Sequence, residues 1–294
     1  MKNFDDLILK AKKGGKKRVV VVGAEDIEAI KAVSEAEQEG FAEPILVGNK
    51  EKIEENLKII EKNYQIIEAD SVEDAAGKGV RLVSSSTADV LMKGNIKTST
   101  LLKAVLNKEW GLRTGNVLSH CAVIETEHLQ KLIMVTDGGM IINPTLKEKI
   151  SIIDNSVSLA HSIGIDIPKV ALIAAVEVVN PDMQATMDAA ILTQMNKRHQ
   201  IKNCIIDGPL GIDNALDMMA AKIKKVDGDV AGKADILVVP DIHSGNFLGK
   251  SAIYFAGGKI AGLILGAKAP IIVVSRANDS KSKLASLALG VLNA

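Results

Sequence analysis

Short runs of β-branched and aliphatic residues alternate along the whole chain with longer stretches in which apolar residues recur every three or four positions. The runs that predict buried strands lie at 18–23, 44–48, 64–68, 88–94, 131–135, 170–175, 204–208, 236–241 and 270–276. The stretches that predict helices lie at 3–13, 26–39, from 50 onward, 71–86 and 146–163. Because strands that alternate with helices form right-handed βαβ units, this pattern predicts an α/β protein with a parallel sheet.

Polar residues follow the predicted strand at 88–94, where Lys93 and Gly94 lead into Thr98. In open α/β sheets ligands bind outside the carboxyl ends of the strands, so Lys93 and Thr98 are candidates for binding a phosphate or a nucleotide. A helix cap with solvated lysines explains the same residues. The spacing is not that of a Walker phosphate loop, and no GxGxxG fingerprint follows the strand at 18–23.

A second candidate site follows the next-to-last predicted strand. It offers a carboxylate, a hydroxyl, a glycine, an amide and an ammonium group where a helix begins. These residues are Asp241, Ser244, Gly245, Asn246 and Lys250. Free N–H groups at a helix N-terminus bind anions, and glycine lets a ligand approach the backbone. An ordinary strand-to-helix turn capped by Asp241 and Ser244 explains the pattern equally well, and the sequence leaves both interpretations open.

The last predicted strand runs into Ser275 and Arg276, and Asp279 follows shortly after. The guanidinium of arginine is a rigid fork of donors suited to phosphate, and a serine hydroxyl can stabilise an oxyanion. Asp279 is near enough in sequence to act as a base or to orient Arg276. The alternative is a capped helix start with a surface ion pair.

The composition narrows the possible ligands. Basic and acidic residues number 36 each, so the formal net charge is zero and the chain lacks the basic surface of a nucleic-acid-binding protein. No basic amphipathic stretch indicates a membrane surface, and the apolar run near the N-terminus is too short for a signal peptide or a membrane span. We therefore expect a cytoplasmic protein that holds an anionic ligand by local donors.

Metal and thiol chemistry have little support in the sequence. Cys121 and Cys204 lie far apart without a CxxC pattern, which argues against a disulfide framework or a structural zinc site. His120 precedes Cys121, but neighbouring residues on a strand point to opposite faces, which argues against a thiol–imidazole couple. The sequence also contains one loose group of carboxylates. Their spacing is explained equally well by a metal site and by the exposed face of a helix. The members of this group are Glu177, Asp182 and Asp188.

A series of motifs after residue 204 resembles, in order and approximate spacing, the phosphate acetyltransferase and phosphate butyryltransferase family. The motifs are DGPL, VAGKAD, VVPD, GN, GGKIAG and SR. Upstream, TDGG at 136–139 resembles the junction between the two lobes of the family. LMKGNIKT at 91–98 and LRTGNVLSH at 112–120 resemble the butyryl branch. The resemblance covers nearly the whole chain.

The resemblance implies two α/β lobes with an interlobe cleft, as in the isocitrate/isopropylmalate dehydrogenase-like fold. Residues 1–140 and 264–294 would form the first lobe, and residues 141–263 the second. The chain would cross between the lobes near residues 140 and 263. The family also generally associates into homo-oligomers.

The resemblance further implies a reversible reaction in which a short-chain acyl-CoA and phosphate give an acyl phosphate and CoA. Coenzyme A is then a substrate, and no metal or redox cofactor is expected. In the direction that consumes acyl phosphate, the CoA thiolate attacks the acyl carbonyl. Ser275 would donate to the developing oxyanion, and Arg276 would hold the phosphoryl oxygens. The residues expected to bind substrates are Lys93, Thr98, Asp241, Ser244, Gly245, Asn246 and Lys250.

The general base is not fixed by the resemblance. In the acetyl branch a catalytic aspartate follows the serine–arginine pair by several residues, and the matching position here is Ser282. The nearest carboxylate is Asp279, which we take as the candidate base. Asp241 and a water held by the loop are the alternatives.

The sequence leaves three other functions as alternatives. A phosphate acetyltransferase differs only in acyl chain length, and one methylene is worth about 1–3 kcal/mol of discrimination. A dehydrogenase of the same fold would need a nicotinamide site and usually a metal-binding aspartate cluster, and neither is evident. A regulator that binds CoA or a nucleotide without turnover is the third alternative, and the combination of Ser275, Arg276 and Asn246 argues against it.

Overall fold

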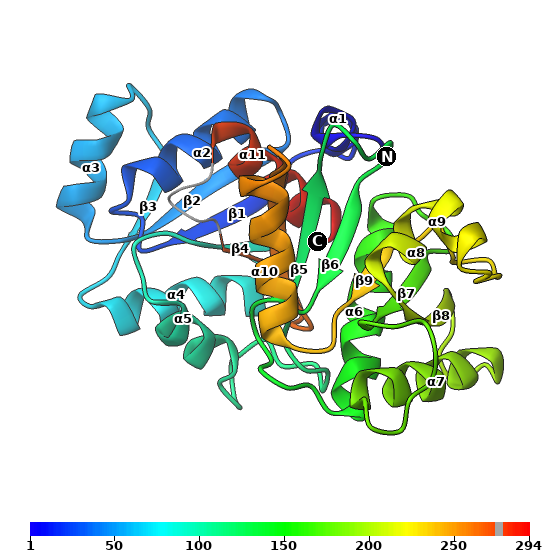
Figure 1. Cartoon of the computed structure of the whole chain (residues 1–294). Helices are drawn as coiled ribbons and strands as arrows, with labels where there is room; N and C mark the ends of the chain where they lie inside the picture. Colours follow the sequence, from blue (N-terminus) through cyan, green and yellow to red (C-terminus); the bar gives the residue numbers. More distant parts are fainter. Residues whose placement is uncertain (274–278) are drawn as a thin grey trace. The chain divides into compact units, whose positions relative to one another are not determined.

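The computed structural model describes residues 1–273 and 279–294 and divides into two compact units (Figure 1). The central unit comprises residues 1–3 and 117–260, and the terminal unit comprises residues 4–116 and 261–294. The first crossing therefore lies near residue 116, whereas the sequence analysis placed it near 140. The difference arises because the residues just after 116 form strands that pair within the central unit.

The terminal unit is a sheet covered by helices. Its elements are α1 (Phe4–Lys13), β1 (Lys17–Val22), α2 (Ile27–Gln38), β2 (Ala42–Gly48), α3 (Lys50–Ile59), β3 (Gln65–Glu68), α4 (Val72–Ser84), β4 (Val90–Lys93), α5 (Thr98–Val105), most of β10 (Lys259–Leu265), β11 (Ile271–Ile272) and α11 (Ser280–Leu292). The strand order is β3-β2-β1-β4-β11-β10. All pairs are parallel except β10 with β11.

The central unit repeats the alternation of strands and helices. Its elements are β5 (Ser119–Glu125), β6 (Ile133–Thr136), α6 (Leu146–Ser162), β7 (Lys169–Ile173), α7 (Gln184–Lys197), β8 (Ile205–Leu210), α8 (Ile212–Leu216), α9 (Met218–Ile223), β9 (Ile236–Val238) and α10 (Ile242–Tyr254). The strand order is β5-β6-β9-β7-β8, and only the pair of β5 with β6 is antiparallel.

The α/β fold predicted from the sequence is confirmed, but the sheet is mixed rather than parallel. The central valines of β1, Val19 to Val22, are fully buried, as expected for a strand covered on both faces. The antiparallel pairs were not predicted, because the apolar residues of a buried strand do not indicate whether the neighbouring strand runs parallel or antiparallel to it.

Local capping explains where several helices begin. Thr145 and Glu148 form a capping box at the start of α6, in which each side chain binds the backbone of the other residue. Asn49 caps α3, and Ser71 caps α4. Within residues 1–273 and 279–294, none of the helices has both the length and the apolar character needed to cross a bilayer.

Candidate functional site

Two parallel strands of the central unit, β6 and β9, end at the same edge of the sheet. Thr136 of β6 lies opposite Val238 of β9. Asp137 follows β6 directly, and Asp241 follows β9 after a short turn. The chain therefore brings the TDGG segment and the Asp241 loop together at the carboxyl edge, which is where ligands bind in sheets of this kind.

Asp137 fixes the loop that follows β6. Its side chain is only 2% exposed. One carboxylate oxygen accepts hydrogen bonds from the backbone N–H groups of Gly139 at 2.8 Å and Met140 at 3.0 Å. The other oxygen accepts from the N–H of Ile141 at 3.1 Å. Asp137 is not among the predicted site residues, although its position after a predicted strand and before two glycines could have indicated it.

The loop after β6 packs directly against the first turn of α10. A methyl group added at Gly138 would lie 2.6 Å from the carbonyl carbon of Gly245, and one added at Gly245 would lie 2.6 Å from Cα of Gly138. The backbone N–H of Ile242 also donates to the carbonyl of Ile142 at 3.0 Å. Because main chain meets main chain here, glycine is required by lack of space rather than by backbone angles.

Asp241 is the N-cap of α10. One carboxylate oxygen accepts from the backbone N–H of Ser244 at 2.8 Å and from its hydroxyl at 3.0 Å. The hydrogen bond from the Ser244 backbone holds the pKa of Asp241 below its usual value. The capping interpretation of these two residues is thus confirmed. A carboxylate held in this way is a weak base, which counts against Asp241 as the general base.

His120 and Cys121 lie on β5. Cys121 is fully buried, and burial raises the pKa of its thiol far above the usual range. A thiol held in its neutral form is a poor nucleophile. His120 lies close to the loop after β6, since a methyl group at Gly139 would be 3.1 Å from Cβ of His120. Burial lowers the pKa of His120, and the nearby charge of Asp137 acts in the opposite direction.

In the terminal unit, β1, β4 and β11 run parallel and end at one edge. Lys93 ends β4, and its ammonium group donates to the carbonyl of Gly94 at 3.3 Å. Gly23, with φ +72°, and Gly94 follow β1 and β4 and pack backbone against backbone. Thr98 is the first residue of α5. The structure therefore places Lys93 and Thr98 at a strand edge of the expected kind.

Ser275 and Arg276 lie outside the described residues. Asp279 is the N-cap of α11, and its carboxylate accepts from the backbone N–H of Ser282 at 2.8 Å. Ser282 itself is buried, with 4% exposure. Asp279 thus has a structural role in starting α11, and its role as a base stays a prediction.

Two of the three carboxylates noted around residue 180 pair with different lysines. Asp188 is buried and pairs with the ammonium group of the equally buried Lys149 at 2.7 Å. Glu177 lies 3.6 Å from Lys224. Asp182 is exposed. In the part of the chain that the structure describes, no three metal-binding side chains converge.

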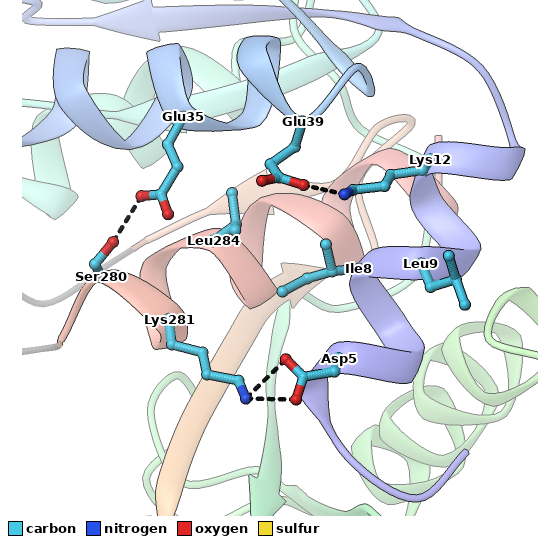
Figure 2. Close-up of a pocket in the computed structure, with 9 residues that line it drawn as sticks. All are labelled: Asp5, Ile8, Leu9, Lys12, Glu35, Glu39, Ser280, Lys281 and Leu284. Carbon is cyan, nitrogen blue, oxygen red and sulfur yellow. Dashed lines mark hydrogen bonds and ion pairs between the residues drawn. The ribbon is translucent and has the colours of Figure 1, made fainter.

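The terminal unit also has an open cavity of about 530 Å³ between α1, α2 and α11, shown in Figure 2. Ile8 and Leu284 contribute apolar walls. Hydrogen bonds and ion pairs cross it and join the three helices. They link Ser280 to Glu35, Lys281 to Asp5 and Lys12 to Glu39. None of the predicted site residues that the structure describes lines this cavity, and the polar groups in it tie the three helices together.

Comparison with known proteins identifies the family to which the chain belongs. Residues 3–73 and 61–291 match the model of the phosphate acetyl/butaryl transferase family. The chain belongs to this family. Among curated relatives, the probable phosphate butyryltransferase of Bacillus subtilis (strain 168) is 50% identical over 97% of this chain and 96% of its own length. The phosphate butyryltransferase of Clostridium acetobutylicum is 45% identical over 99% of this chain and 98% of its own length.

A solved structure agrees with the family assignment. The branched-chain phosphotransacylase from Enterococcus faecalis V583 is 31% identical, with a TM-score of 0.83, and the match covers 94% of this chain and 98% of that one. The two chains therefore share both family and fold.

In this member of the phosphate acetyl/butaryl transferase family, the first turn of α10 brings most of the predicted central-unit residues together. Asp241, Ser244 and Asn246 lie in or beside that turn, with Gly245 buried between them. Lys250 is exposed further along the same helix. The close packing of this turn on the Asp137 loop was invisible in the sequence, because it joins segments that are far apart along the chain.

Proposed function

We propose that the chain is a phosphate acyltransferase of the butyryl type, which converts a short-chain acyl-CoA and phosphate reversibly into an acyl phosphate and CoA. The near-full-length similarity to phosphate butyryltransferases carries this proposal. The main alternative is acetyl transfer, since the family includes both activities. Acyl chain length depends on the volume of the pocket that receives the chain.

The reaction is a direct acyl transfer. In the direction that forms acyl-CoA, a base removes the proton of the CoA thiol, and the thiolate attacks the acyl carbonyl carbon of the acyl phosphate. The C–S bond forms, the bond from that carbon to the phosphate oxygen breaks, and phosphate leaves. Ser275 donates to the oxyanion of the tetrahedral intermediate, and Arg276 holds and neutralises the departing phosphate. Coenzyme A takes part as a substrate, and the proposal includes no metal or redox cofactor.

The strand-end loops bind the substrates in this proposal. At the start of α10 the exposed amide of Asn246 can donate to an anion, and Lys250 adds a positive charge on the same helix. In the terminal unit, Lys93 and Thr98 take the corresponding role at the edge of β4 and α5. The family resemblance supports two lobes of the isocitrate/isopropylmalate dehydrogenase kind, with the substrates between them.

Asp279 is the proposed general base, and its cap interaction allows a clean test. Asparagine caps a helix about as well as aspartate but cannot accept the thiol proton. Asp279→Asn should therefore keep α11 intact and lower kcat by about 10²- to 10⁴-fold. Unchanged kcat in a folded Asp279→Asn protein would remove Asp279 from the mechanism.

The test of the function is a thiol-release assay with phosphate and acyl-CoAs from acetyl to branched and longer chains. We expect phosphate-dependent CoA release with a maximum at butyryl-CoA or isobutyryl-CoA. Arg276→Ala should lose about 10²- to 10³-fold in rate, while the exposed Arg198→Ala keeps it. No release with any acyl-CoA would reject the proposal, and NAD(P)-linked absorbance changes with hydroxy acids would favour the dehydrogenase.

A further inference from the structure

The proposed acyl transfer requires a proton transfer at the phosphate, in addition to the one at the thiol. An acyl phosphate is a dianion near neutral pH, so its departing oxygen would leave as trianionic phosphate unless it gains a proton. In the opposite direction, hydrogen phosphate loses that proton as it attacks the carbonyl carbon of acyl-CoA. Arg276 does not release a proton, and Asp279 is assigned to the thiol. A further acid–base group is therefore required beside the phosphate.

His120 lies at the carboxyl edge of the central unit. It is the second residue of β5, which runs antiparallel to β6 with Cys121 opposite Thr136. The backbone carbonyl of His120 accepts a hydrogen bond from the hydroxyl of Thr136 at 3.0 Å. The helix α10 lies on β5 and β6 (Figure 1). His120 is thus next to the loop that Asp137 holds and that packs on the first turn of α10.

His120 is partly exposed beside this loop. Gly139, which lies against the imidazole, is exposed and has no side chain to cover the ring. A methyl group added there would be 3.1 Å from Cγ and 3.4 Å from Nδ1 of His120. Within residues 1–273 and 279–294, the ring nitrogens have no hydrogen-bond partner. They are therefore available to a substrate.

On the basis of the proposed acyl transfer, we propose that His120 exchanges this proton with the phosphate. To form acyl phosphate, the neutral imidazole takes the proton of hydrogen phosphate while a phosphate oxygen bonds to the thioester carbonyl carbon. The C–S bond then breaks, and the thiolate takes the proton held by Asp279. In the opposite direction, the imidazolium gives its proton to the departing oxygen as the C–O bond breaks. Both side chains return to their starting forms by proton exchange with water.

The surroundings of His120 suit both of its protonation states. Burial lowers the pKa of the imidazole below the usual value of 6.5, so the ring is neutral near neutral pH and can accept a proton. The nearby carboxylate of Asp137 acts in the opposite direction and stabilises the imidazolium once it has formed. A group with this balance can act as a base in one direction and as an acid in the other.

Other charged groups on the helices packed against β5 are engaged or exposed. Asp241 caps α10 by accepting from the backbone of Ser244, and Lys149 on α6 pairs with Asp188. His243 and Lys250 are exposed on α10. In the part of the chain that the structure describes, Asp137 is the charged group that acts on His120.

The first test is an NMR titration of the wild-type chain, labelled with ¹³C at histidine, with inorganic phosphate in the presence of CoA. CoA and phosphate do not react with each other, so the complex is stable. The chain has five histidines, and the spectrum of His120→Gln identifies the His120 signal. We expect excess phosphate to shift this signal and to leave the exposed His128, His161 and His199 unaffected. An unmoved His120 signal would overturn the proposal.

The second test is the rate of His120→Gln with butyryl-CoA and phosphate. Glutamine forms hydrogen bonds but does not take up a proton, so kcat should fall by about 10²- to 10⁴-fold with little change in the KM for phosphate. The exposed His128→Gln is the matched control and should keep the wild-type kcat. An unchanged kcat in folded His120→Gln would overturn the proposal and leave the acyltransferase function intact. No CoA release by the wild type would instead reject that function.

The pH profile separates proton transfer from a structural role. Because the neutral imidazole is the acceptor, wild-type kcat for acyl phosphate formation should fall as the pH drops through the folded pKa of His120, which lies below 6.5. The ionisation of phosphate affects the wild type and His120→Gln alike, so the variant should lack only the contribution of the imidazole. A variant that is slower but keeps the wild-type profile would show a structural role and overturn the proposal.

Discussion

Gly138 and Gly245 pack main chain against main chain at the carboxyl edge of the central unit. A methyl group on either residue would lie 2.6 Å from the backbone of the other. Gly138 belongs to the loop held by Asp137, and Gly245 belongs to the first turn of α10. Their contact therefore sets the position at which the helix starts. The proposed substrate-binding residues around Asn246 depend on it.

Gly245→Ala should disturb the site by overpacking. The added methyl group would also lie 2.9 Å from Cγ2 of Val239, so the turn must move. We expect a loss of about 1–3 kcal/mol in the free energy of unfolding and at least about a tenfold fall in kcat/KM. The measurements are denaturant unfolding and the thiol-release assay.

Gly249→Ala on the same helix is the control for Gly245→Ala. Among the described residues the methyl group there would meet only Cδ1 of Ile260, at 3.4 Å, and alanine favours a helix over glycine by about 1 kcal/mol. Activity should be retained and stability equal or higher. Equal losses in both variants would show that the contact with Gly138 has no special role.

Asp137→Ala should weaken the loop after β6, because the N–H groups of Gly139, Met140 and Ile141 lose their acceptor. We expect the free energy of unfolding to fall by about 2–4 kcal/mol, together with a drop in activity. Asp182→Ala, at an exposed carboxylate, should change stability by no more than about 0.5 kcal/mol. Matching unfolding curves for the two variants would contradict this role of Asp137.

Lys149→Met should be strongly destabilising because it leaves the carboxylate of Asp188 buried without its cation. The expected loss is about 3–5 kcal/mol in the free energy of unfolding. Lys149→Met/Asp188→Leu should recover much of this loss, since both charges are then absent. Lys224→Met, which removes an exposed ammonium group beside Glu177 and Asp213, should have little effect. A mild effect of Lys149→Met alone would show that water reaches Asp188.

His120 should make stability depend on pH below neutrality. Burial lowers its pKa in the folded state relative to the usual value of 6.5. The unfolded chain therefore binds the proton more tightly, so this contribution to stability is fully present above pH 6.5 and is lost as the pH falls through the folded pKa. We expect Tm to fall less between pH 7 and pH 5 in His120→Gln than in the wild type. His128→Gln, at an exposed position, should follow the wild-type curve.

Much of the local structure could be predicted from the sequence. The valine run of β1, the apolar spacing of α4 and the helical pattern at 146–163 predicted elements that the structure confirms within a few residues. These features depend on neighbours in sequence, through burial of β-branched runs and through side chains that bind nearby backbone groups. The motifs after residue 204 also indicated the family, which the comparisons confirm.

Contacts between distant segments were decided only by the tertiary structure. The direction of β5 against β6, the packing of Gly138 on Gly245 and the burial of Lys149 with Asp188 each join residues that no local pattern relates. In α10 both faces carry apolar residues, so periodicity could not tell the covered face from the exposed one. The sequence determined most of the segments that become strands and helices, because that choice is largely local, although it did not indicate β10. The tertiary structure determined which of their side chains meet, because that depends on how the whole chain packs.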